Sequence, residues 1–173
     1  MSLQSSLIEG LYHSLDKCQP SSLLTKLIYR KKNSLYIKDQ TYALKKNGIY
    51  IIGFGKASAG MACELEKIIG HSRIASGLVI TPPTKIRTKK INLFESSHPK
   101  LTEKSFIAGQ KLIDYSRSIP ANSLVICLNS GGGSALIASP TPNLSIKEKT
   151  DFFEFLLTKG INEIDQNVIR KSI

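Results

Sequence analysis

Apolar residues recur at helical spacing near the start of the chain. Within residues 5–18 they occupy every third or fourth position, which predicts a helix with one hydrophobic face. Gln-Pro at 19–20 breaks this pattern, and a second amphipathic helix is predicted from there through residue 28. Two short extended stretches follow at 34–37 and 41–44, with a turn at 46–48, and they predict a small hairpin.

From residue 49 the pattern changes to short apolar runs separated by helical segments. Continuous apolar runs are typical of parallel strands that are covered on both faces. They lie at residues 49–52, 77–81, 91–94 and 123–128. We expect the last of them, Ser-Leu-Val-Ile-Cys-Leu, to be the most deeply buried strand.

Helices are predicted between and after these runs. One extends from about residue 56 to 69 and stops at Gly70, a residue type that is common just past a helix C-terminus. Another covers 102–118, and the capping box Ser145-x-x-Glu148 begins a third. Alternating strands and helices predict a three-layer α/β/α, Rossmann-like domain with a mostly parallel sheet. The pattern at 164–173 stops without an end signal, so we expect the domain to be incomplete.

The composition is that of a soluble globular protein with one domain. The 173 residues are 41% hydrophobic and 21% charged, and no apolar run approaches the roughly 18 residues that a membrane span requires. The N-terminus has neither the basic start nor the apolar stretch of a signal peptide. We therefore expect a cytoplasmic protein with no membrane partner. The oligomeric state is left open, a homo-oligomer included.

Cysteines and histidines do not indicate a metal site. Cys18, Cys63 and Cys127 form no Cys-x-x-Cys pair, and we expect them to be buried free thiols. The three histidines are equally scattered along the chain, which disfavours structural zinc.

The chain is strongly basic, with a formal net charge of +11 from 24 Lys and Arg against 13 Asp and Glu. The densest basic cluster lies at residues 29–32. A basic surface can bind nucleic acid or anionic metabolites. No zinc-finger, helix-turn-helix or RNP-type signature accompanies the charge, so nucleic-acid binding is disfavoured and most lysines are expected on a solvated surface.

The first of two glycine turns, Gly53-Phe54-Gly55-Lys56, follows the strand at 49–52. It resembles a dinucleotide-binding fingerprint, but Ser58 stands at the third glycine position and the next strand ends without a carboxylate. A Walker A loop fails too, because Ala57 follows the lysine. What remains is a tight turn that places Lys56 at a helix N-terminus, where an anionic ligand would offset the unfavourable helix dipole. The alternative is a surface lysine beside two turn glycines.

The second turn has three consecutive glycines after the strand at 123–128. It consists of Ser130, Gly131, Gly132, Gly133 and Ser134. Glycines allow several backbone N–H groups to converge on a phosphate or carboxylate, and the two serines add hydroxyl donors. Because ligands of open parallel sheets bind beyond the carboxyl ends of the strands, this turn predicts an anion site.

Other candidate chemistry is sparse. His98-Pro99 follows the strand at 91–94 at the same edge of the sheet, where it is either a rigid turn or part of the site. Ser130 and Ser134 are weak candidates for a hydrolase nucleophile, since no Gly-x-Ser-x-Gly elbow is present.

Four segments taken together resemble the N-terminal domain of the glycerate 2-kinase family, whose members carry a second, MOFRL domain. The segments are G-F-G-K-A-S-A-G-M-A, S-S-H-P-K-L-T-E-K-S, L-N-S-G-G-G-S-A-L-I and N-V-I-R-K-S-I. The family patterns GxGKAA…MA, HPxPxExS, SGGGSAL and NxVRKHLS occur in this order, and the resemblance covers nearly the whole chain from residue 5. Ser172 departs from the family's usual His, and Asp165 replaces a Glu.

The resemblance implies ATP-dependent phosphorylation of D-glycerate to 2-phosphoglycerate, with a divalent metal such as Mg²⁺. It implies catalytic roles for Lys56 and Arg170, which match the lysine of GKA and the arginine of VRKHLS. Gly53, Gly55, His98 and the turn at 130–134 would then bind substrate or phosphate. A general base and metal ligands are not indicated, and the MOFRL domain is absent, so we expect this chain to be inactive alone.

Two other functions stay open. Some relatives in the family are labelled hydroxypyruvate reductases, a function that needs NAD(P) and that the missing ribose-binding carboxylate argues against. A non-catalytic module that binds anions or nucleic acid is the remaining alternative.

Overall fold

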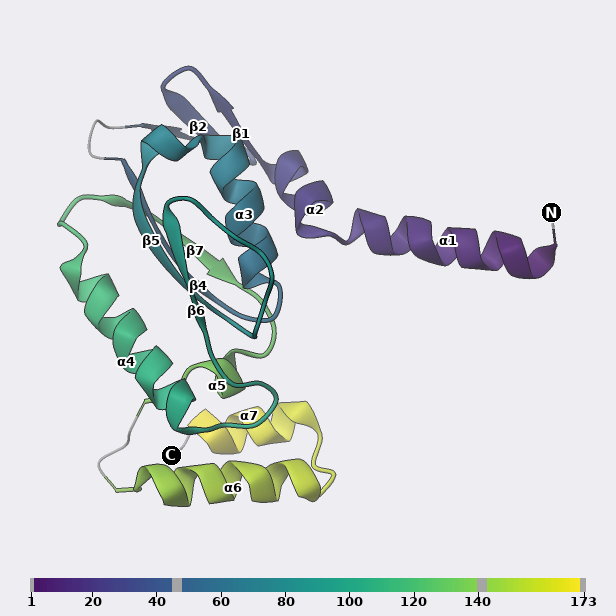
Figure 1. Ribbon diagram of the computed structural model, residues 1–173, viewed down its shortest axis with the longest axis vertical. Helices are drawn as coiled ribbons and strands as arrows, with labels where there is room; N and C mark the ends of the chain where they lie inside the picture. The colour runs from purple at the N-terminus through teal and green to yellow at the C-terminus, as the bar shows by residue number, and fades with distance from the viewer. Residues whose placement is uncertain (1, 45–47, 140–142, 172–173) are drawn as a thin grey trace.

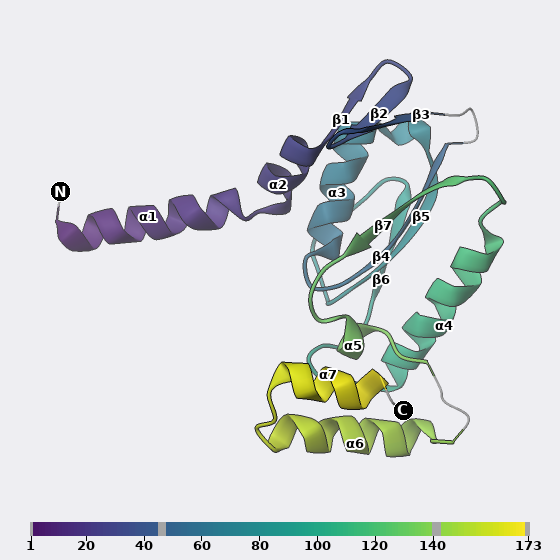
Figure 2. The ribbon, with the colours of Figure 1, turned by 180° about the vertical axis from the view of Figure 1, so that it is seen from behind.

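A computed structural model describes residues 2–44, 48–139 and 143–171 of the chain. Residues 46 and 47 of the predicted turn, and Ser172 at the end of the family pattern, lie outside these ranges. Figures 1 and 2 show a central sheet with helices on both faces, a small second sheet at one end and a long N-terminal helix that projects from the body.

The central sheet has four parallel strands. They are β4 (Ile49–Phe54), β5 (Ile74–Thr81), β6 (Ile91–Glu95) and β7 (Leu124–Asn129). Their spatial order is β6-β5-β4-β7, and every pairing is parallel. This is the order of the first four strands of a dinucleotide-type, doubly wound sheet. The predicted three-layer α/β/α fold is confirmed.

The two layers of helix come from the segments between the strands. Helix α3 (Ser58–Ile69) packs Ala62, Leu65 and Ile69 on one face of the sheet. Helix α4 (Glu103–Ser118) packs Ala108 against Leu78 and Ile80 on the other face. A fully buried Leu or Ile contributes about 1.5–3 kcal/mol. These contacts are therefore the main force that holds the helices on the sheet.

Local signals set the ends of these helices. Gly70 ends α3 with a φ of 88°, a conformation that glycine adopts without strain, and the short 3₁₀ turn His71–Arg73 leads into β5. Thr102 and Ser105 form the capping box at the start of α4. The sequence had predicted both ends correctly.

Strand β7 contradicts the expectation of deep burial. Within the described residues it pairs only with β4, so it is an edge strand, and α4 covers β5 rather than β7 on the face opposite α3. Leu128 is buried against the core beneath α3, whereas Val125 and Cys127 are exposed. An apolar run alone does not reveal which neighbours will cover it, and the prediction was wrong for this reason.

The three cysteines are free thiols, as predicted, but the expected burial was wrong. Cys18 and Cys127 are exposed and Cys63 is half-buried. Cys18 follows a helix that leaves the body, and Cys127 lies on the uncovered face of β7.

The N-terminal region contains helices α1 (Leu3–Lys17) and α2 (Pro20–Leu27) and an antiparallel sheet of β1 (Ile28–Lys31), β2 (Ser34–Ile37) and β3 (Gln40–Ala43). The sequence had not predicted β1, because its basic residues Arg30 and Lys31 indicated only a solvated surface. Pairing with β2 supplies the missing stabilisation, and the rings of Tyr29 and Tyr36 stack with centroids 4.7 Å apart.

The C-terminal region forms a layer beyond the carboxyl ends of the parallel strands (Figures 1 and 2). It contains the short helix α5 (Gly133–Leu136), α6 (Ile146–Thr158) and α7 (Glu163–Lys171). Among the described residues, none of the helices is both long and apolar enough to cross a membrane.

Candidate functional site

The two glycine turns lie against each other at the carboxyl edge of the sheet. The N–H of Lys56 donates to the carbonyl of Gly131 at 2.8 Å, and the N–H of Ala57 donates to Oγ of Ser130 at 3.0 Å. The N–H of Ser130 donates in turn to the carbonyl of Phe54 at 3.1 Å. These bonds follow from the pairing of β4 with β7, which brings the ends of both strands together.

The glycines of the first turn are explained by close packing. Gly55 has a φ of 127°, and a Cβ atom on it would collide with Ser130. Gly53 lies inside β4, buried, where a Cβ atom would be 2.6 Å from the carbonyl oxygen of Leu128. Gly55 therefore allows the two turns to meet, and Gly53 allows β4 and β7 to approach each other.

Lys56 and His98 converge on Gly132. An ideal Cβ atom at Gly132 would lie 2.9 Å from Nε2 of His98 and 3.0 Å from Cγ of Lys56. Gly132 also has a φ of 92°, so both its backbone conformation and its neighbours require glycine. Two nitrogen-bearing side chains from different strand ends thus flank the middle of the triple-glycine turn.

Most backbone N–H groups of this turn have no partner within the part of the chain that the structure describes. Among the hydrogen bonds of the described residues, none is donated by the N–H groups of 131–134. The carbonyls of Gly131 and Gly132, by contrast, accept from neighbouring backbone amides. Free N–H groups in consecutive residues form a concave site that favours an anion.

Arg170 reaches this turn from α7. Its Nη1 donates to Oγ of Ser134 at 3.2 Å, and its guanidinium carbon lies 4.7 Å from the centroid of the Phe153 ring. Burial lowers the pKa of Arg170, an effect that Glu163 opposes. The guanidinium stays charged at neutral pH because the pKa of arginine is so high. The structure thus gathers Lys56, His98 and Arg170 around the 130–134 turn.

Two shallow cavities border the cluster. One, of about 250 Å³, lies beside Lys56 and is lined by the start of α2 and by Thr81, Pro82 and Pro83. The other, of about 440 Å³, lies on the side of His98. Both open at the carboxyl edge of the sheet, which is where a small substrate is expected.

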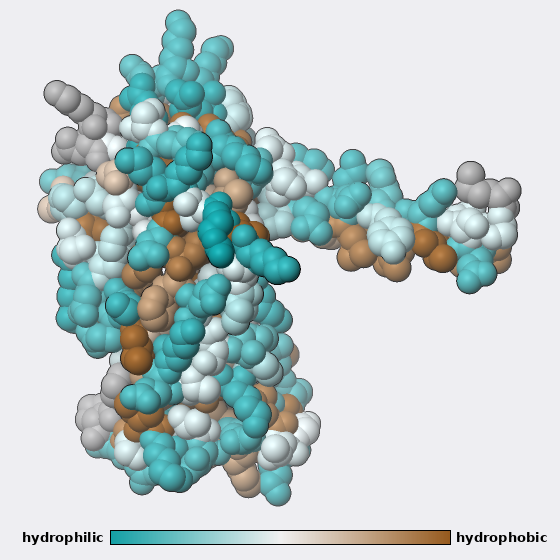
Figure 3. Space-filling view, viewed as in Figure 1, coloured by the Kyte–Doolittle hydropathy of each residue, from teal (hydrophilic) through white to brown (hydrophobic). Residues whose placement is uncertain are grey.

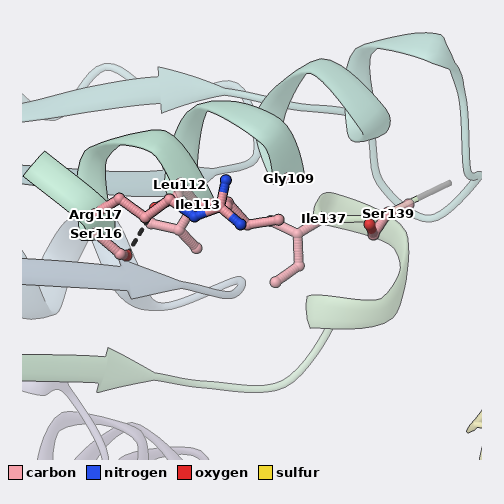
Figure 4. A pocket seen from close by; sticks show the side chains of 8 residues that line it. Gly109, Leu112, Ile113, Ser116, Arg117, Ile137 and Ser139 are labelled. Carbon is pink, nitrogen blue, oxygen red and sulfur yellow. Dashed lines mark hydrogen bonds between the residues drawn. The ribbon is translucent and has the colours of Figure 1, made fainter.

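A third, mainly apolar groove lies apart from this cluster (Figure 4). It has a volume of about 500 Å³ and runs between α4 and the segment 137–139, and Leu112, Ile113, Arg117 and Ile137 are among its lining residues. None of its lining residues belongs to the cluster around Gly132.

The described residues contain no group of three His, Cys, Asp or Glu side chains that could hold a metal ion. The residue most clearly missed from the sequence is Phe153, which contacts Arg170. Its apolar position in α6 indicated only a core residue, and no local signal connects residue 153 with residue 170.

Residues 7–173 match the profile of a family described as "Domain of unknown function (DUF4147)". The chain belongs to this family. The match covers all the residues of the cluster. The resemblance seen in the four sequence segments is confirmed by the similar proteins of known name.

Among these, the glycerate kinase of Rattus norvegicus is 30% identical over an alignment of 155 residues that covers 80% of this chain and 29% of that protein. A protein of Agrobacterium vitis that is provisionally named a hydroxypyruvate reductase is 32% identical over 123 residues, or 71% of this chain and 32% of that protein. The chain thus spans about a third of the length of the curated relatives it matches.

A solved structure shares the fold. A protein from Pyrococcus horikoshii OT3 superposes with a TM-score of 0.81 at 24% identity, over 100% of this chain and 39% of that one. The helices, the parallel sheet and the C-terminal layer therefore follow an arrangement that this solved structure shares.

Proposed function

We propose that this chain is the N-terminal α/β domain of a glycerate kinase that phosphorylates D-glycerate to 2-phosphoglycerate with ATP. The observation that carries the proposal is the convergence of Lys56, His98 and Arg170 on a turn with four free amides. The names of the relatives support the choice of substrate. Because the chain spans about a third of those relatives, we expect a further MOFRL domain to be needed for activity.

Phosphoryl transfer requires mainly positioning and neutralisation of charge, and the cluster supplies both. The amides of 131–134 bind an anionic group, either a phosphate of ATP or the carboxylate of glycerate. Lys56 neutralises negative charge on the phosphoryl group as it transfers, and Arg170 adds a second cation beside Ser134. His98 donates a hydrogen bond to the same group across Gly132.

ATP and a divalent metal differ in how well this chain can hold them. The free amides and the cations fit the phosphates of a nucleotide. The described residues offer no carboxylate cluster for Mg²⁺, so no step is assigned to a metal held by these residues. If Mg²⁺ takes part, its ligands come from outside the described ranges or from the nucleotide.

The deciding experiment is a glycerate kinase assay on the protein as its gene encodes it. Lys56→Ala is expected to lower kcat/KM by about a hundredfold or more, the scale of loss seen when a group that stabilises transition-state charge is removed. Lys67→Ala is the matched control, since Lys67 lies exposed at the far end of the neighbouring helix. Full activity of Lys56→Ala would refute the role of this lysine.

The same assay on residues 1–173 alone is expected to show no turnover. Robust phosphorylation by this piece would contradict the need for a second domain. NADH-dependent reduction of hydroxypyruvate would indicate the reductase named among the relatives. The sequence after β5, Pro82-Pro83-Thr84, disfavours that outcome because it has no carboxylate for the ribose hydroxyls.

A further inference from the structure

Phe153 lies under the guanidinium group of Arg170. The ring belongs to α6 and the arginine to α7, and the guanidinium carbon is 4.7 Å from the ring centroid. Phe153 is buried and packs in one cluster with Leu101 and Phe106, so its ring is held from behind. A fixed aromatic face at this distance attracts the cation and orients its plane.

The stacking contact leaves the N–H donors at the edge of the guanidinium free to form hydrogen bonds. An arginine carries five N–H donors around its rim, and stacking on a ring uses none of them. Nη1 donates to Ser134, whereas Nε is buried and has no hydrogen-bond partner among the described residues. A buried donor without a partner is costly, so Nε needs a hydrogen-bond acceptor from outside the described residues, such as a water or an anion.

We propose that Phe153 is a positioning residue, which holds the edge of Arg170 toward the 130–134 turn so that the free donors receive a phosphate or carboxylate group. The inference deepens the proposed function, on which its kinetic consequence rests, but its claim about anion binding can be tested without turnover. The ring sets the plane of the guanidinium, and the bond to Ser134 sets its rotation within that plane. The anion accepts hydrogen bonds from the remaining N–H groups.

Three variants distinguish the effect of the aromatic face of Phe153 from the effect of its hydrophobic packing. Phe153→Leu keeps an apolar side chain and removes the ring face. Phe153→Tyr keeps the face and should restore binding. Phe153→Trp also keeps it and introduces the only tryptophan of the chain, whose fluorescence would report an anion at the neighbouring arginine.

The measurement is the affinity for inorganic phosphate at low salt, by calorimetry or by competition in the kinase assay. Phe153→Leu is expected to weaken phosphate about five- to tenfold, the range that one cation–π contact and lost preorganisation allow. The KM of the phosphate-bearing substrate should rise more than kcat falls. In the double variant Phe153→Leu/Arg170→Lys, phosphate should bind no more weakly than in Arg170→Lys alone. The reason is that both substitutions remove the same feature, the guanidinium stacked on the ring.

Phe106→Leu is the matched control. Phe106 is buried in the same cluster, but the guanidinium of Arg170 stacks on Phe153. Phe106→Leu should therefore lower the melting temperature as much as Phe153→Leu does, without changing the phosphate affinity.

Equal loss of affinity in both leucine variants, additive effects in the double variant, or failure of Phe153→Tyr to restore binding would each overturn the inference. So would a wild-type protein that does not bind phosphate. A wild type that binds phosphate with the expected coupling but phosphorylates no glycerate would instead refute the proposed function and leave the inference standing.

Discussion

At the scale of single residues, Gly132 is the point at which the parts of the candidate site meet. Its neighbours are Nε2 of His98 and the stem of Lys56, each about 3 Å from where a Cβ atom would lie. Its φ of 92° lies in the left-handed region. Space and backbone conformation therefore restrict this position to glycine for two independent reasons.

Replacing Gly132 by alanine should damage the site more than the fold. The left-handed backbone costs about 1–2 kcal/mol for a residue with a Cβ atom, and the methyl group would also push His98 and Lys56 apart. We expect phosphate affinity to fall at least about tenfold in a calorimetric titration.

Gly160→Ala is the control for backbone strain. Gly160 also has a positive φ, 64°, but a Cβ atom at this position would meet no other atom within 4 Å. Gly160→Ala should lower the free energy of unfolding by a similar amount and leave the phosphate affinity unchanged. Equal phosphate affinity in the two variants would show that the neighbours of Gly132 do not matter.

At the scale of elements, Glu66 of α3 attaches the loop before β6 to the helix layer. Its carboxylate accepts backbone N–H bonds from Lys89, Lys90 and Ile91 at 2.6–2.9 Å. Glu66 is 3% exposed, so these bonds satisfy a buried charge. A single side chain thereby fixes the position of the start of β6, the strand that leads to His98.

Glu66→Gln should destabilise the fold by about 2–3 kcal/mol, because charge-assisted bonds are lost and the amide NH₂ would face a backbone N–H. Urea denaturation measures the change. Glu64→Gln on the same helix removes an ion pair with exposed Lys67 and should cost less than about 0.5 kcal/mol. Similar costs for both changes would show that the three backbone bonds contribute little.

At the scale of the whole molecule, helix α1 contributes almost nothing to the core. It has no buried residue, and the apolar side chains along it form a visible stripe on the arm that projects from the body (Figure 3). Leu7, Ile8, Leu11 and Leu15 are all exposed. Such a helix of 15 residues is marginal without tertiary contacts.

Deleting residues 1–15 should therefore change the free energy of unfolding by less than about 0.5 kcal/mol. Leu24→Ala in α2 provides the comparison, since Leu24 is buried in the main core and its truncation should cost about 2–4 kcal/mol. Urea denaturation of dilute protein measures both. A loss above about 1 kcal/mol on deletion would show that α1 packs on the body in solution.

Much of the fold was determined by local sequence patterns. Apolar runs at 49–52 and 77–81 and the helical spacing between them were enough to predict parallel strands with crossover helices, because period and length distinguish the two elements. The placement of the two glycine turns at the same edge of the sheet also followed, since parallel strands end at a common edge. Their contact was decided by the pairing of β4 with β7. Strand β1 was missed because its stability comes from a partner strand.

The sequence by itself determined the four parallel strands, the helices α3 and α4 and the two glycine turns. Together with the family resemblance, it also determined the choice of Lys56, His98 and Arg170 as candidates. Only the tertiary structure decided which faces are covered and which side chains touch. Burial depends on neighbours far away in the chain, so the apolar run of β7 could not reveal its exposed Val125 and Cys127. The contact of Phe153 with Arg170 likewise exists only because α6 and α7 pack beside each other at the end of the sheet.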